Sequence, residues 1–170
     1  MKTKHIVIDA QNDFTYGALR NDDAINAIPN IRKELDKAVA AGDEIFFTMD
    51  THHKDYMQTF EGQNLPVPHC IMGTEGREIV NELLPYTEKA TVLNKNTFGF
   101  LRWKEYLEDA DIVRVCGFCT DICVISNLLI IRAIFPNKRI ILVENACAGV
   151  TKESHAAAVM TARACQIEIE

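Results

Sequence analysis

Residues 112–135 read IVRVCGFCTDICVISNLLIIRAIF, and this stretch decides the fold class. Its first four residues, Ile112–Val115, are a short apolar run of the kind found in strands that are buried on both faces. From Asp121 to Phe135 the chain is apolar almost all round, which predicts a helix that is buried or lies in a subunit interface. A strand that runs directly into such a helix is the repeating unit of a parallel α/β sheet.

The same alternation continues on both sides of this stretch. Apolar residues recur at helical spacing from Ala24 to Val39; Asn21 and Asp22 suit the N-cap of this helix, and Gly42 suits its end. Hydrophobic patterns predict further strands at 5–8, 44–49, 91–93, 139–143 and 166–169, and further helices at 74–83, 101–107 and 152–164. This order predicts one α/β domain over residues 1–170, with three αβα layers, a six-stranded, mostly parallel, Rossmann-like sheet and right-handed crossovers.

Composition excludes several classes of protein. The 170 residues include 18 Lys and Arg against 24 Asp and Glu, and the net charge of −6 argues against a nucleic-acid partner. A hydrophobic content of 48% and a charged content of 25% are those of a globular protein, and they exclude disorder, collagen and coiled coil. No apolar run reaches the roughly 18 residues of a membrane span, and residues 1–10 lack a signal-peptide pattern. We therefore expect a cytoplasmic protein with no membrane partner and with six reduced cysteines.

Reactive side chains follow several of the predicted strands. Asp9 follows the first strand, Lys95 the third, and Cys123 comes after the fourth, where a helix begins. Open parallel sheets bind their ligands outside the carboxyl ends of the strands, and all these ends lie at one edge. We therefore expect the three side chains to converge although they are distant in the sequence.

The chemistry of these three residue types points to acyl transfer. A thiol is nucleophilic only as a thiolate, which a nearby lysine ammonium and a helix N-terminus both favour. A carboxylate can take the thiol proton and later deliver it to a leaving group. Backbone N–H groups at the start of the helix can hold a developing oxyanion. Together these groups are suited to a reaction that passes through a thioester.

A second cluster comprises Asp50, His52 and His69. Two histidines and a carboxylate suit Zn²⁺, Fe²⁺ or Mn²⁺. Residues 50–73 show little periodicity, and a loop of this length inside a compact domain is usually functional or disordered. On these residues alone, a metal site and a polar loop with incidental histidines are equally good interpretations.

Two other functions receive less support from the residues. Cys116 and Cys119 have the CxxC spacing of redox and zinc sites, but no second CxxC pair completes a zinc site, and Cys116 falls inside a predicted strand. A dinucleotide-binding domain would need a glycine-rich turn after the first strand, where this chain has residues 10–13, Ala-Gln-Asn-Asp.

The sequence resembles the isochorismatase-like cysteine hydrolases, and within them the nicotinamidases. The motifs that carry the resemblance are VIDAQNDF (7–14), DTH (50–52), PVPHCIMG (66–73), LNKNTFGF (93–100), GFCTDICV (117–124) and NACAG (145–149), followed by Thr151 and His155. These motifs are spread over essentially the whole chain.

This resemblance implies the roles of particular residues. It implies a catalytic triad of Asp9, Lys95 and Cys123. It implies an oxyanion hole made by the N–H groups of Cys119 and Cys123, beside a cis peptide bond between Phe118 and Cys119.

The resemblance also implies a metal and a substrate pocket. Asp50, His52 and His69 would hold a divalent cation, zinc or else iron or manganese, and in nicotinamidases this cation orients the pyridine nitrogen of the substrate. Phe14 would line the substrate pocket.

The expected function is that of a metal-assisted cysteine amidohydrolase that releases ammonia from a small carboxamide, with nicotinamide preferred, and the expected assembly is a homo-oligomer. Nicotinamidases commonly carry a tryptophan where this chain has Pro66, and the loop after Asp50 has Thr51 and His53 where they usually show an aromatic residue and a proline. Three alternatives therefore stay open: another amide or N-carbamoyl substrate, vinyl-ether hydrolysis, and a non-catalytic metal or small-molecule binding module.

Overall fold

The computed structural model describes residues 1–170 and contains one six-stranded sheet in the order β3-β2-β1-β4-β5-β6, in which every pair of neighbouring strands is parallel. The strands are β1 (Thr3–Ile8), β2 (Glu44–Asp50), β3 (Thr91–Lys95), β4 (Ile112–Phe118), β5 (Arg139–Ala148) and β6 (Glu168–Ile169). The helices are α1 (Asp22–Ala41), α2 (Phe60–Asn64), α3 (Leu84–Thr87), α4 (Trp103–Leu107), α5 (Ile125–Ile134) and α6 (Lys152–Ala164). The predicted α/β class and the parallel sheet are confirmed.

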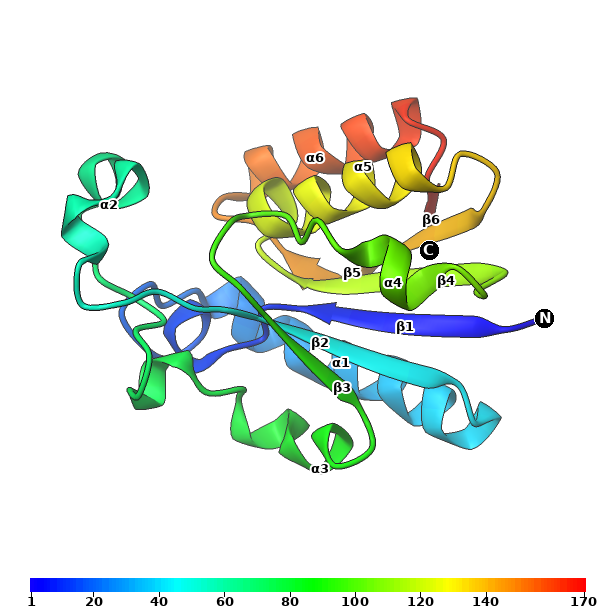
Figure 1. Cartoon of the computed structure of the whole chain (residues 1–170), viewed down its shortest axis with the longest axis horizontal. Coiled ribbons are helices and arrows are strands. Elements are labelled where there is room, and N and C mark those ends of the chain that lie inside the picture. Colours follow the sequence, from blue (N-terminus) through cyan, green and yellow to red (C-terminus); the bar gives the residue numbers. More distant parts are fainter.

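Helices cover both faces of this sheet. α1 packs on one face, with α3 on the same side, and α5 and α6 cover the other face with α4 against α5 (Figure 1). The chain winds from β1 to β3 in one direction and from β4 to β6 in the other, so the strand order reverses between β1 and β4. Crevices at such a reversal, outside the carboxyl ends of the strands, are where open α/β sheets bind ligands.

The two strands at this reversal approach each other very closely at Gly117. A Cβ atom at this position would lie 2.1 Å from the carbonyl oxygen of Ile8, and the Gly117 φ of +114° is one that other residues rarely adopt. Glycine is therefore required where β4 passes the end of β1.

The predicted limits of the first helix agree with the structure. The Asn21 side chain accepts a hydrogen bond of 3.1 Å from the N–H of Ala24, and Gly42 ends α1 in the left-handed conformation with φ of 72°. No helix in the protein combines the length and the apolar character that crossing a bilayer would require.

The region predicted as a helix at 74–83 differs in the structure. It forms two 3₁₀ turns, Glu75–Arg77 and Asn81–Leu83, which lead into α3. The backbone between these turns bonds to the loop after β1 instead: Asn12 donates to Glu78 O at 2.9 Å, and Val80 donates to Ala10 O at 3.0 Å. Tertiary hydrogen bonds have here replaced those of a continuous helix.

Two further differences lie at the carboxyl edge of the sheet. The segment 50–73, expected to be irregular, contains the short helix α2, whose N-cap is Thr59. β5 continues to Ala148 rather than ending near Glu144, because it pairs again with β4 at Phe118 after an irregularity in register.

An ion cluster under α1 generates a prediction about stability. Glu34 of α1 is 3% exposed and forms an ion pair with Arg114 of β4, and its Oε1 lies 3.1 Å from His5 Nδ1. Burial alone would raise the pKa of Glu34, but its hydrogen bonds with His5 and Arg114 outweigh this and lower it to about 2. A group whose pKa is lowered on folding stabilises the protein above its unfolded pKa and loses this effect as the pH falls.

Glu34→Gln should therefore lower the free energy of unfolding at pH 7 by about 2 kcal/mol, after allowance for solvent screening. This deficit should shrink as the pH falls from about 4.5 to about 2, the ordinary and the folded pKa of Glu34. Urea denaturation of both proteins across this pH range measures it. Equal free energies of unfolding for the two proteins at pH 7 would contradict a stabilising role of the Glu34 carboxylate.

Candidate active site

Asp9 is fully buried directly after the carboxyl end of β1. Its φ of 47° turns the chain out of the strand, in a conformation that Asp tolerates better than most residues. The hydroxyl of Thr48, on the neighbouring β2, donates a 2.6 Å hydrogen bond to Asp9 Oδ1. Asp9 Oδ2 is thereby left to face the next group in the site.

That group is Lys95, at the last position of β3. Its Nζ lies 2.6 Å from Asp9 Oδ2 and donates to Cys123 Sγ at 3.6 Å. The same Nζ is also 3.6 Å from Asp50 Oδ1. The structure thus brings Asp9, Lys95 and Cys123 together around one ammonium group, which also reaches the candidate metal ligands.

Burial is the largest single influence on the pKa of each group in this cluster. Burial raises the pKa of the Asp9 carboxyl, and the Lys95 ammonium opposes this only in part. Burial would lower the pKa of Lys95, but Asp9, together with Cys123 and Asp50, outweighs it and holds that pKa above its ordinary value. Burial also raises the pKa of the Cys123 thiol, and Asp9 adds to this while Lys95 opposes it. Lys95 lowers the pKa of Cys123 as expected, but burial raises it more, so the thiol needs a nearby acceptor for its proton before it can attack as a thiolate.

The turn that carries Cys123 begins at a cis peptide bond between Phe118 and Cys119. Residues 120–124 then form one wide π-type turn, which leads into α5. The N–H of Cys119 donates no hydrogen bond to any group of the chain. A free backbone donor therefore lies on the same turn as the candidate nucleophile.

A cleft of about 1080 Å³ opens over these residues. Phe14, Cys119 and Cys123 all line it, as do Asp50 and His69. The ring of Phe14 packs edge-on against His69, with 5.6 Å between the ring centroids. The predicted pocket residue Phe14 thus lines the cleft beside His69 of the second cluster.

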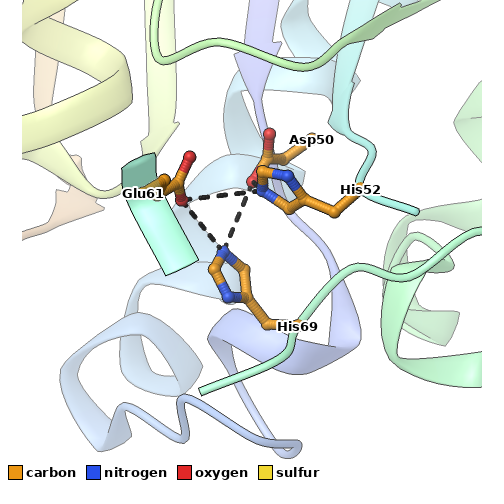
Figure 2. A group of neighbouring side chains, drawn as sticks. All are labelled: Asp50, His52, Glu61 and His69. Carbon is orange, nitrogen blue, oxygen red and sulfur yellow. Dashed lines mark hydrogen bonds and ion pairs between the residues drawn. The ribbon is translucent and has the colours of Figure 1, made fainter. Parts of the chain in front are cut away.

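Asp50, His52 and His69 converge as the sequence led us to expect, and Glu61 of α2 joins them (Figure 2). His52 Nε2 lies 2.9 Å from Asp50 Oδ2. His69 Nε2 lies 3.6 Å from Asp50 Oδ2 and 3.6 Å from Glu61 Oε1, and His52 Nε2 is also 3.6 Å from Glu61 Oε1. One donor atom from each of the four residues lies within 4.8 Å of the other three.

These residues fit a divalent metal ion. Donor atoms about 2.1 Å from a tetrahedral metal lie about 3.4 Å from one another, close to the separations of 2.9–3.6 Å found here. His69 Nδ1 lies 2.8 Å from the carbonyl oxygen of Val67; donation of a proton there leaves Nε2 free to bind a cation. Burial would raise the pKa of Asp50, but the hydrogen bond with His52 and the nearby His69 and Lys95 hold it well below its usual range, so this candidate ligand is ionised.

Three residues that support the site were missed in the sequence. Glu61 lies in the segment 50–73, whose sequence shows little hydrophobic periodicity. The Gln11 amide accepts from Asp50 N–H at 2.8 Å and donates to Asp50 O at 2.8 Å, which fixes this ligand. Asn127 donates to Cys123 O at 2.7 Å and accepts from Phe100 N–H at 2.8 Å, so it joins the nucleophile turn to the loop after β3. The signal for Asn127 was a polar residue inside an otherwise apolar helix.

Glu61 should act as a fourth ligand for a divalent metal, for which zinc is the probe. Glu61→Gln removes a charged donor and should weaken zinc binding at least about tenfold, while Glu153→Gln, an exposed residue at the start of α6, should not change it. Competition with a chromogenic chelator measures both affinities. Unchanged zinc affinity in Glu61→Gln would exclude Glu61 from the ligand set.

Comparison with known proteins places this geometry in a family. The isochorismatase domain model matches residues 3–169. The isochorismatase family protein PncA of Bacillus subtilis (strain 168) is 29% identical over 173 residues, covering 92% of this chain and 91% of that protein.

Solved structures agree with this match. The nicotinamidase/pyrazinamidase PncA from Bacillus subtilis has a TM-score of 0.86 at 26% identity, covering 99% of both chains. The pyrazinamidase of Pyrococcus horikoshii in complex with zinc has a TM-score of 0.86 at 25% identity, covering 100% of this chain and 99% of that one. The protein therefore belongs to the isochorismatase family and is a hydrolase of that family.

Proposed function

We propose that this hydrolase is a cysteine amidohydrolase that releases ammonia from pyridine carboxamides, with nicotinamide, which yields nicotinate, as the simplest substrate. The observation that carries the proposal is the placement of Lys95 Nζ, 2.6 Å from Asp9 Oδ2 and 3.6 Å from Cys123 Sγ. A nucleophile, a proton acceptor and a fixed positive charge thus meet beside an unpaired backbone donor at Cys119. The likeness to the nicotinamidase of Bacillus subtilis supports this substrate class.

In the first half of the reaction, Asp9 accepts the proton of the Cys123 thiol and the sulfur attacks the carboxamide carbon. The raised pKa of Asp9 suits it to hold that proton. The N–H groups of Cys119 and Cys123 hold the oxyanion of the tetrahedral intermediate. When the C–N bond breaks, Asp9 returns the proton to the nitrogen, ammonia leaves, and a thioester to Cys123 remains.

In the second half, Asp9 takes a proton from water as the water oxygen attacks the thioester carbon. The C–S bond breaks, the carboxylic acid is released, and the proton on Asp9 returns to the sulfur. Lys95 remains charged throughout and fixes the orientation of Asp9 through their 2.6 Å ion pair.

Asp50, His52, Glu61 and His69 would hold the divalent metal. When bound, this ion would take the ring nitrogen of the substrate as a further ligand, beyond these four side chains, and so orient the carboxamide. The complex of the Pyrococcus horikoshii pyrazinamidase with zinc supports zinc as this ion.

One observation favours a second candidate, another amide or an N-carbamoyl compound on the same triad. The only tryptophan of the chain, Trp103, is fully buried and donates to Asn127 Oδ1 at 2.8 Å, outside the cleft. No indole is therefore present to stack on a pyridine ring. A screen of carboxamides and N-carbamoyl compounds separates the two candidates.

Cys123→Ala should lower ammonia release from nicotinamide by at least about 1,000-fold, because no other group can form the thioester. Cys165→Ala is the matched control: this half-buried cysteine lies at the end of α6, outside the cleft, and its loss should leave turnover intact. A coupled ammonia assay on the zinc-loaded proteins measures both. Turnover retained in Cys123→Ala would contradict the mechanism.

A further inference from the structure

The cleft has an outer zone that neither the triad nor the metal ligands use. The floor of the cleft is buried, since Phe14 is 8% exposed and Cys123 is 6% exposed. Its rim consists of four apolar side chains that line the same cleft but face solvent, namely Phe60 (83% exposed), Val150 (58%), Phe98 (47%) and Leu65 (38%). We call these four residues the apolar rim.

The cleft is larger than the proposed head group requires. Pockets that bury a drug-sized molecule occupy about 300–1,000 Å³, and this cleft of about 1080 Å³ lies just above that range. A single pyridine ring with its carboxamide, held between the metal ligands and Cys123, occupies only the floor. Such a substrate leaves the apolar rim in contact with water, which is unfavourable in proportion to the apolar area exposed.

The charges around the cleft disfavour an anionic substituent on the substrate. Arg20 lines the cleft, but its guanidinium is paired with Asp22 at 2.9 Å, and Asp22 also lines the cleft. The remaining charged groups of the lining, Asp50 and Glu61, belong to the metal ligands. Apart from neutral polar side chains such as Asn64 and Asn96, the outer zone therefore offers apolar surface and no free cation.

Part of the apolar rim is linked to the metal ligands through one short helix. Phe60 is the first residue of α2, Glu61 is the second, and Leu65 directly follows its end. α2 packs mainly on the 3₁₀ turn at 56–58 and stands beyond the carboxyl ends of the strands, away from the body of the protein (Figure 1). A metal ion bound through Glu61 would hold Phe60 and Leu65 at the mouth of the cleft.

From these observations we infer that the enzyme prefers pyridine carboxamides that carry a neutral apolar substituent, which Phe60, Leu65 and Phe98 contact. The inference rests on the proposed function, which supplies the chemistry of the head group. Position 5 of a pyridine-3-carboxamide adjoins neither the ring nitrogen nor the carbon that bears the carboxamide. A substituent there leaves both reacting ends free and extends toward the rim.

The test compares nicotinamide, 5-phenylnicotinamide and 5-carboxynicotinamide on the zinc-loaded protein. We expect kcat/KM for the phenyl compound to exceed that for nicotinamide by at least about tenfold, and the carboxy compound to be poorer than the phenyl compound. Calorimetry with zinc-loaded Cys123→Ala should show the same order in Kd without turnover. Phe60→Ala should reduce the preference for the phenyl compound about tenfold, whereas Met160→Ala, an exposed apolar residue on α6 outside the cleft, should leave it unchanged.

The outcomes distinguish this inference from the proposed function. Efficient hydrolysis of nicotinamide with weaker binding and slower turnover of the phenyl compound overturns the inference and leaves the proposed function standing. If neither compound is hydrolysed or bound, the proposed function fails and the inference fails with it. If Phe60→Ala changes the oligomeric state in light scattering and not the substrate preference, the apolar rim is a contact between copies of the chain, and the inference is overturned.

Discussion

The buried ion pair between Lys95 and Asp9 is the interaction on which the rest of the site depends. Neither charge is stable in the interior without a partner, so each requires the other to be placed correctly. Strand register supplies that placement: Thr48 pairs with Ile8, next to Asp9, and Lys95 pairs with Asp50. A slip of one residue between these strands would turn the side chains to the opposite face. Fold and site are therefore specified by the same backbone pairing.

The loop after β1 extends this control to the metal ligands. The Gln11 side chain hydrogen-bonds to both the N–H and the carbonyl oxygen of Asp50. Asp13 accepts a 2.7 Å hydrogen bond from the N–H of Cys70, which is next to His69. One short segment thus positions the proposed proton acceptor Asp9 and two candidate ligands from distant parts of the chain. The candidate metal ligands and the proposed nucleophile lie close together, because Asp50 and Cys123 both approach the Nζ of Lys95.

The sequence predicts the sheet, its parallel order and the convergence of Asp9, Lys95 and Cys123, because apolar runs and helical periodicity are local signals and parallel strand ends share one edge. It does not predict features that arise from tertiary bonds. The helix expected at 74–83 is interrupted by bonds to the loop after β1, and Glu61 is brought to the metal ligands by a helix of five residues without a hydrophobic pattern. The apolar rim could not be predicted from the sequence either, because only the fold brings Phe60 and Phe98 to one cleft.

We propose that Cys123 forms a thioester with the acyl group of its substrate. Rapid acid quenching of the zinc-loaded protein during turnover of nicotinamide, followed by intact mass measurement and peptide mapping, tests this most directly. A nicotinoyl group should be found on the peptide that carries Cys123, and none on the Cys123→Ala protein. Turnover with no acylated cysteine at any time after mixing would contradict it.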